Sequence, residues 1–159
     1  MAQNTTLKRA RELYQSASFY EDSAKVLFDL LAGKDFKSDP ILKAYQGAAI
    51  TIQARYSWNP VKKLEFFNIG KNLIEEAVKA APNAWEIRYV RFTVQEGSPG
   101  FLGYRNNLSG DKKIIINQLT VAAQNPPELY IARQAALYLL KSEEVNSTEK
   151  SQIRALASS

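Results

Sequence analysis

The sequence predicts an all-α protein of about seven to eight helices, arranged as antiparallel helical hairpins that stack into an α–α superhelix. Apolar residues recur three and four positions apart along most of the chain, which is the period of an amphipathic helix. An Asp-Pro or Asn-Pro pair precedes three of these patterns, and such pairs favour the first turn of a helix. Because the chain has 159 residues, of which 45% are hydrophobic, we expect residues 1–159 to form a single domain with short disordered ends.

Two helices are expected near the amino terminus. Between Leu7 and Ala17, apolar residues recur at helical spacing with charged residues between them. Ser18 is followed three positions later by Glu21, which is the spacing of a capping box and predicts the start of a second helix. That helix should end at Gly33, because glycine commonly terminates helices.

Two further helices are expected to begin at Pro40 and Pro60. The residues before them, Asp39 and Asn59, can accept hydrogen bonds from the free amides of a first helical turn. Gly47 lies in the middle of the third helix, where a missing side chain would let another helix approach closely. The apolar stripe of the third helix is Ile41, Tyr45, Ala48, Ile52 and Tyr56, and the fourth helix should bury Leu64, Phe67, Ile74, Ala77, Val78 and Ala81 before it stops at Pro82.

Residues 84–94 carry conflicting signals. They are rich in β-branched and aromatic residues and alternate in polarity, which is typical of a strand. However, Asn83 followed by Glu86 resembles a helix start, and the neighbouring segments are helical. We therefore predict a helix here, with a strand as the alternative.

The remainder of the chain predicts three more helices after a loop that contains four of the seven glycines. Ser109 or Asp111 can cap a sixth helix. Asn125-Pro126 should begin a seventh, and a short last helix would carry Ile153 and Leu156. The glycines of the loop are expected to occupy turns that need a positive φ.

A weak internal repeat accompanies these helices. A small residue, a large one, an alanine and a proline follow one another as Gly70, Ile74, Ala77 and Pro82, and parts of the pattern recur from residues 24 and 115. The pattern resembles the second helix and junction of a tetratricopeptide repeat, although the starts lie 70 − 24 = 46 and 115 − 70 = 45 residues apart, longer than the roughly 34 of that repeat. The resemblance implies a TPR-like superhelix of lengthened hairpins. The alternative is a set of unrelated amphipathic helices whose alanines coincide.

Three segments also resemble a family of small exported bacterial helical proteins without an established activity. They are KAYQGAA at 43–49, NPVKKLEFFNIGKNLIEEAVKAAPNAWEIRYVR at 59–91 and FLGY at 101–104. Members of that family carry a signal peptide that ends in a small residue before Gln, so the resemblance implies that Ala2-Gln3 is a trimmed start. It further implies a periplasmic or otherwise exported protein, with the cytoplasm as the alternative location.

The composition argues against most kinds of catalysis. The chain has no Cys and no His, which removes thiolate nucleophiles, thiolate metal sites and the commonest general base. Neither a GxSxG nor a GxxxxGK[ST] motif occurs. We therefore expect no enzyme activity, no cofactor and no metal site. No apolar run approaches the roughly 20 residues of a membrane span.

The candidate binding site lies around the glycine-rich loop. Arginine guanidinium groups bind carboxylates, and aromatic side chains add contact area, so we interpret these residues as a groove for an acidic or C-terminal peptide segment. The chain would then be a non-catalytic protein–protein interaction or scaffold module, as concave helical-repeat surfaces often are. The residues are Arg88, Arg91 and Gln95 on one helical face, followed by Phe101, Tyr104, Arg105 and Lys112.

Alternatives to this interpretation remain open. Arg88 and Arg91 can instead pair with Glu86, Glu96 or Asp111, while the aromatic residues anchor the loop in the core. The net charge of +5 would permit nucleic-acid binding, but the 21 Lys and Arg residues are dispersed along the chain. A carboxylate-based hydrolase is a further alternative, and it would require two acidic groups that face one cleft.

Overall fold

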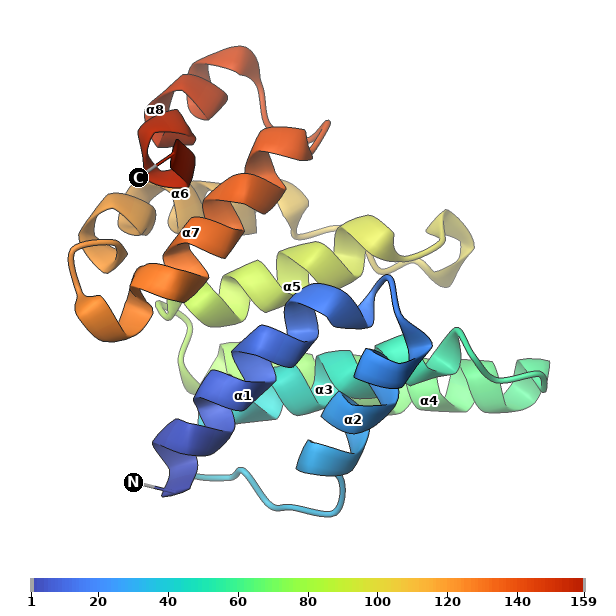
Figure 1. The fold of residues 1–159 in the computed structure, drawn as a ribbon. Coiled ribbons are helices and arrows are strands. Elements are labelled where there is room, and N and C mark those ends of the chain that lie inside the picture. Colours follow the sequence, from blue (N-terminus) through green and yellow to red (C-terminus); the bar gives the residue numbers. More distant parts are fainter. Residues whose placement is uncertain (1, 159) are drawn as a thin grey trace. The chain divides into compact units, whose positions relative to one another are not determined.

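The computed structural model describes residues 2–158, with side chains from residue 5 onward, and it confirms the all-α class (Figure 1). No strand occurs within this range. The helices are α1 Ala2–Ala17, α2 Glu21–Leu31, α3 Pro40–Ala54, α4 Pro60–Ala80, α5 Trp85–Gly97, the short 3-10 helix η1 Gly100–Leu102, α6 Leu108–Ala122, α7 Pro126–Lys141 and α8 Ser147–Ser158. Disorder is expected for a few residues at each end, but α1 begins at Ala2 and α8 continues to Ser158; Met1 and Ser159 lie outside the described residues.

The chain divides into two compact units, Met1–Pro82 and Asn83–Ser159, where the sequence analysis expects one domain. In each unit, the main contacts join helices that are consecutive in the chain, as hairpins require. In the first unit α3 also contacts α1 and α2, and in the second unit α6 also contacts α7 and α8. One helix in each unit is therefore surrounded by the others.

The α3–α4 hairpin is held by the closest helix contact of the first unit. Lys43 Nζ lies 3.4 Å from Glu76 Oε2, whereas Gly70 faces Gly47 and Thr51, so the two helices are antiparallel. A Cβ atom on Gly47 would come within 2.5 Å of the Gly70 carbonyl oxygen. The two backbones therefore touch at a point where no side chain fits.

Three of the six predicted helix starts are confirmed, those at Pro40, Pro60 and Pro126. Asp39 Oδ1 accepts a hydrogen bond from the Leu42 amide at 3.1 Å, and Asn59 Oδ1 accepts one from the Val61 amide at 2.9 Å. The seventh helix begins at Pro126 as predicted. These starts are local, because a proline at the first turn, joined in α3 and α4 by a capping side chain before it, specifies them without distant contacts.

Three predicted caps are wrong. Ser18 does not cap α2, whose N-cap is Tyr20, and Asn83 does not cap α5, whose N-cap is Ala84. The sixth helix begins at Leu108, ahead of both proposed capping residues. In each case the helix begins after a neighbouring residue, Tyr20, Ala84 or Asn107, whose side chain makes no capping hydrogen bond. Leu64, which was expected to be buried by α4, is exposed.

Residues 85–97 form α5, so the strand alternative is wrong. Most of the helix is buried, and Tyr89 and Phe92 make edge-to-face contacts with Tyr138 of α7, with ring centroids 6.1 and 6.2 Å apart. The helix is rich in β-branched and aromatic residues, as strands are, because most of its sides are buried and need large apolar side chains for packing. None of the described helices is long and apolar enough to cross a bilayer.

We expect Gly70→Ala to lower the free energy of unfolding by about 2 kcal/mol, because over-packing a tight contact costs about 1–3 kcal/mol. The added methyl group would lie 2.6 Å from Thr51 Cγ2 and would also meet the Gly47 carbonyl oxygen. Urea denaturation followed by circular dichroism measures the change.

Gly110→Ala is the matched control. Gly110 also lies in a helix, but nothing stands within 4 Å of its Cβ position. Alanine there should raise the free energy of unfolding by up to about 1 kcal/mol. Equal destabilisation by the two substitutions would show that backbone contact does not hold the hairpin.

Candidate functional site

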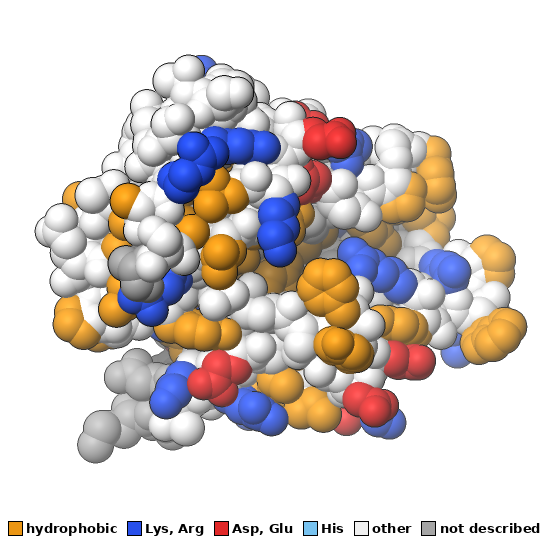
Figure 2. All heavy atoms as spheres, turned by 45° about the horizontal axis from the view of Figure 1, so that its top comes forward, with side chains coloured by type: hydrophobic (Ala, Val, Ile, Leu, Met, Phe, Trp, Pro, Cys, Tyr) orange, Lys and Arg blue, Asp and Glu red, His pale blue; other side chains and the backbone are white. Residues whose placement is uncertain are grey.

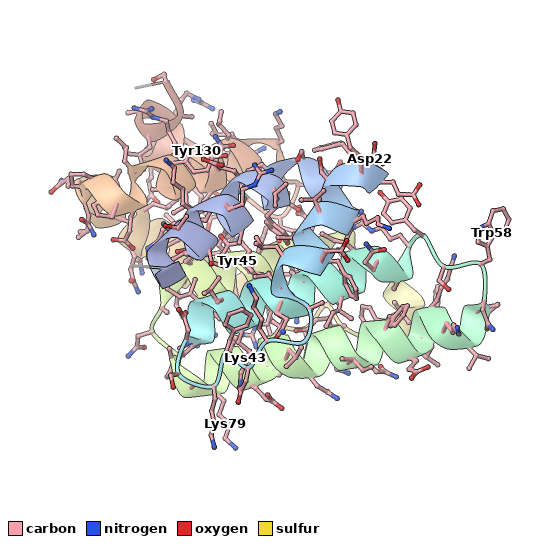
Figure 3. The ribbon with its side chains drawn as sticks, turned by 60° about the horizontal axis from the view of Figure 1, so that its bottom comes forward. Asp22, Lys43, Tyr45, Trp58, Lys79 and Tyr130 are labelled. Atoms are coloured by element: carbon pink, nitrogen blue, oxygen red, sulfur yellow. The ribbon has the colours of Figure 1, made fainter. Side chains whose placement is uncertain are left out.

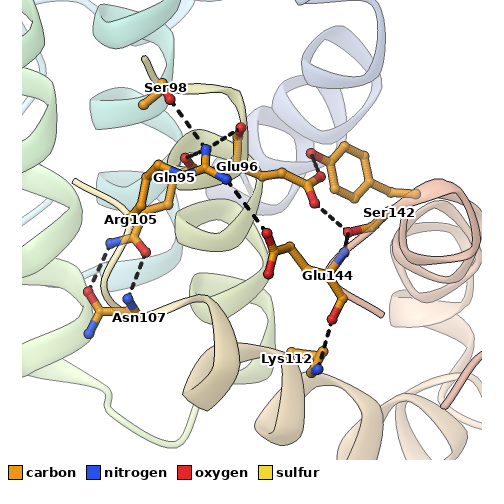
Figure 4. Close-up of polar contacts among 9 residues, drawn as sticks. Gln95, Glu96, Ser98, Arg105, Asn107, Lys112, Ser142 and Glu144 are labelled. Carbon is orange, nitrogen blue, oxygen red and sulfur yellow. Dashed lines mark hydrogen bonds and ion pairs between the residues drawn. The ribbon is translucent and has the colours of Figure 1, made fainter. Parts of the chain in front are cut away.

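The structure brings together six of the seven predicted site residues in the second unit. Three of them, Arg88, Arg91 and Gln95, lie along α5, from its first turn to its last. Tyr104 and Arg105 lie on the loop of residues 98–107, and Lys112 lies near the start of α6. Figure 4 shows Gln95, Arg105 and Lys112. We call this assembly the loop network; it comprises Arg88, Arg91, Gln95, Tyr104, Arg105, Asn107, Asp111 and Lys112. Phe101 belongs to the loop but takes no part in the polar contacts.

A buried carboxylate neutralises the two arginines of α5. Asp111 Oδ1 accepts from Arg88 Nη1 at 2.9 Å and from Arg91 Nη2 at 2.7 Å, while its Oδ2 accepts from Arg91 Nε at 2.8 Å. Asp111 is 0% exposed and Arg91 only 3%. The Arg91 fork is the bidentate geometry that a carboxylate binds best. Arg91 is therefore a core residue, and the arginines pair with Asp111 as the alternative interpretation states.

Gln95 connects the end of α5 to the end of the loop. Its Nε2 donates to Asn107 Oδ1 at 2.8 Å, and its Oε1 accepts from the Asn107 amide at 3.0 Å (Figure 4). The Gln95 side chain is fully buried, so both of its polar atoms need these partners. Gln95 fixes the loop and does not face a ligand.

Arg105 caps the carboxyl end of α5. Its Nη1 donates to the carbonyl oxygens of Gln95 at 2.9 Å, Glu96 at 2.7 Å and Ser98 at 3.3 Å (Figure 4). Carbonyls at the end of a helix lack the amide partners of the helix interior, and a cation is favoured beside them. The Gln95 carbonyl also accepts from the Ser98 amide at 3.3 Å. A second nitrogen, Nη2, lies 3.7 Å from Glu144 Oε1.

The two aromatic residues of the loop differ in their surroundings. Tyr104 is buried, and Gly103 before it has a φ of 66°, a left-handed conformation that glycine adopts without strain. Phe101 is 88% exposed. The interpretation of an anchoring loop therefore holds for Tyr104 and is wrong for Phe101.

The Lys112 ammonium group binds a carbonyl and a carboxylate near the start of α8. Its Nζ donates to the Glu144 carbonyl oxygen at 2.8 Å and lies 3.1 Å from Glu149 Oε1. Glu149 also forms a reciprocal cap with Asn146, because each backbone amide donates to the side-chain oxygen of the other residue at 2.9 Å. Sequence reasoning missed this cap although the spacing of three residues signals it.

Several opposing effects set the pKa of the Glu149 carboxyl. Partial burial raises this pKa, but the Asn146 amide, the hydrogen bond from Lys112 and the positive charges of Lys112 and Lys113 lower it more. The net result is a pKa below the ordinary value of a glutamate. The ionised form of Glu149 therefore stabilises the folded state.

A second polar cluster, which the sequence did not reveal, joins α5 to the end of α7. Glu96 Oε1 accepts from the Tyr138 hydroxyl at 2.6 Å, and Glu96 Oε2 accepts from Ser142 Oγ (Figure 4). Ser142 Oγ in turn accepts from the Glu144 amide at 3.1 Å. These partners are more than 40 residues apart in the chain, and no local pattern connects them.

On the face drawn in Figure 2, Lys and Arg side chains form several separate groups rather than one continuous area. Within residues 2–158, no group of three or more Asp, Glu, His or Cys side chains could hold a metal ion. Comparisons with protein-family models, curated proteins and solved structures give no match to the chain.

We expect Asp111→Asn to lower the free energy of unfolding by about 3 kcal/mol, because breaking a buried ion pair leaves charge without compensation. Two guanidinium groups share this carboxylate, and one of them is buried. Urea denaturation measures the difference. Glu144→Gln is the control, because its carboxylate is partly exposed and 3.7 Å from Arg105, so less than about 0.5 kcal/mol should be lost. Similar losses in the two variants would contradict the structural role of Asp111.

We expect Glu149→Gln to lower the free energy of unfolding by about 0.5–1 kcal/mol at neutral pH. Because the folded-state pKa is depressed, this contribution is present above the unfolded-state pKa and disappears as the pH falls through the folded-state pKa. Urea denaturation at neutral and acidic pH should therefore show the two proteins converging in acid. Glu143→Gln, on the same connection between α7 and α8, should change little at either pH. A difference between wild type and Glu149→Gln that persists in acid would contradict the assignment.

Proposed function

We propose that the chain is a non-catalytic protein–protein interaction module whose partner contacts the loop of residues 98–107. The observation that carries the proposal is the exposure of Phe101 on a loop that is fixed to the unit by the buried Tyr104 and by hydrogen bonds of Arg105 and Asn107. Large aromatic side chains contribute most of the binding free energy in many protein interfaces. An isolated phenylalanine that is held outward suits such a role.

The loop network supports the proposal by ordering the loop before a partner arrives. Arg105 ties the loop to three carbonyls of the α5 end, Gln95 and Asn107 close its far end, and Tyr104 packs beneath it. A loop that is already ordered loses less conformational entropy on binding, which strengthens the complex. The polar residues thus position Phe101 rather than contact the partner.

The chemistry of the partner follows from which side chains of the loop network and the loop are exposed and which are already paired within the unit. Arg88 and Arg91 are compensated by Asp111, so the main contact is proposed to be an apolar pocket that receives Phe101. Within the loop network, an acidic group of the partner would contact Arg105, whose side chain is 36% exposed, and would compete there with Glu144. An acidic or C-terminal segment is therefore proposed as a secondary feature of the partner.

The remaining parts of the proposal rest on the sequence. The lack of His and Cys supports a role other than catalysis. The proposal of an exported protein rests on the resemblance of residues 43–49, 59–91 and 101–104 to exported bacterial proteins. The genomic reading frame before Ala2 tests it, because a signal peptide must be encoded there if the protein is exported.

We expect Phe101→Ser to weaken capture of the partner by at least about tenfold, because a central aromatic contact is worth about 2 kcal/mol or more. The wild type and the variant are immobilised side by side, exposed to extract of the source cells, and the protein that differs is purified and titrated. The stability of the chain should not change, since Phe101 is exposed.

Val121→Ser is the matched control for this experiment. Val121 is an exposed apolar residue of α6 that lies outside the loop network. The control should bind the purified partner as tightly as the wild type does. Equal binding by wild type and Phe101→Ser, or no specific capture by wild type, would overturn the proposal.

A further inference from the structure

The first unit exposes an apolar surface at the turn between α3 and α4, which we call the Trp58 turn (residues 55–65). Trp58 is 99% exposed, and Figure 3 shows its side chain at the outer end of the turn, pointing away from the helices. Val61 and Leu64, on the first turns of α4, are also exposed. A fully exposed tryptophan beside further apolar residues marks an interaction surface.

The turn between α1 and α2 adds two aromatic residues at the same end of the unit. Phe19 is 78% exposed and Tyr20 is 65% exposed. A shallow hollow of about 380 Å³ joins the two turns, because it is lined by Glu21 of α2 and by residues of the Trp58 turn. The lining residues from the Trp58 turn are Arg55, Tyr56, Ser57, Trp58 and Lys63. Two aromatic residues of the Trp58 turn thus line the hollow, whereas the α1–α2 turn contributes only Glu21, the residue that follows Tyr20.

The cations of the Trp58 turn differ from those of the loop network. Arg55, Lys62 and Lys63 are in no ion pair within the described residues, whereas Arg88, Arg91 and Lys112 are all paired. Glu65 is the only acidic residue of the turn, so the turn carries a surplus of positive charge. Glu21 and Asp22 of α2 oppose this surplus from the neighbouring turn.

We propose that this end of the first unit docks on the surface of an anionic lipid bilayer. Trp58 and Tyr20 would enter the interfacial region, where aromatic side chains with a polar edge are favoured, and Phe19 would add buried apolar area there. Arg55, Lys62 and Lys63 would lie against lipid phosphate groups, which attract basic residues near the surface. The protein remains on one face of the bilayer in this arrangement.

A bilayer fits the surface better than an acidic peptide does. The aromatic residues stand on two turn tips rather than along a groove, and Trp58 has almost no protein surface around it. A protein partner would need matched pockets for each of these side chains. A fluid interface receives them at separate points, while its phosphate groups compensate the unpaired cations.

Tryptophan fluorescence provides a direct test, because the chain has two tryptophans in opposite environments. Trp58 is exposed, whereas Trp85 is buried in the second unit. We expect the emission of the wild type to shift to shorter wavelength when vesicles of phosphatidylcholine and phosphatidylglycerol are added. Trp58→Phe should show no shift, since only Trp85 remains. A shift that persists in Trp58→Phe would overturn the proposal.

Co-sedimentation with the same vesicles measures the contribution of each group. Trp58→Ser and Lys63→Glu should each weaken binding by roughly tenfold. Glu21→Gln should strengthen binding by about fivefold, because it removes a negative charge from the hollow. Val121→Ser should bind as the wild type does, and circular dichroism should show all variants folded.

The remaining outcomes decide between lipid and protein. Weaker binding to vesicles of phosphatidylcholine alone, and weaker binding at high salt, would support the role of the cations. The proposal is overturned if the wild type fails to sediment with anionic vesicles at low salt. It is also overturned if the wild type binds a soluble acidic peptide but not vesicles, or if Trp58→Ser binds vesicles as tightly as the wild type.

Discussion

The second unit depends on one buried carboxylate. Asp111 enters α6 at its first turn and receives two arginines from α5, so the two helices are joined by charge-assisted hydrogen bonds in the core. A buried pair of this kind gains less from attraction than it loses in hydration, unless its geometry satisfies every atom of the carboxylate. Both Asp111 oxygens are bonded here. The pair therefore fixes the position of α6 against α5, and with it the two ends of the loop that carries Phe101.

Cations serve different purposes in the two units. In the second unit Arg88, Arg91, Arg105 and Lys112 lie against carboxylates or helix-end carbonyls and hold elements together. In the first unit the basic residues of the Trp58 turn have no such partners within residues 2–158. Positive charge that is compensated internally adds to order, whereas uncompensated charge remains available to another molecule. The net charge of the chain is therefore a poor guide to where it binds.

The helices were largely predictable because their starts are local. The side chains of Asp39 and Asn59 cap the helices that begin directly after them, and the proline that follows each of them favours the first helical turn. The composition of α5 left a strand open as the alternative to the predicted helix, because the burial of α5 depends on contacts with Tyr138 of α7, which lies far along the chain. The partner of Arg91 was one of several acidic residues within reach, and only the folded chain selects Asp111. The exposure of Trp58 had no signal at all, since tryptophans are mostly buried in proteins.

The contact between Gly47 and Gly70 limits how the first unit can vary. Both positions already carry the smallest residue, so an enlargement at one cannot be offset by a reduction at the other. At core sites with larger side chains, an enlargement of one residue can be compensated by a smaller residue beside it, so that the total side-chain volume stays the same. Homologous chains that keep this hairpin should thus retain the two glycines together, or lose both along with the close crossing of the helices.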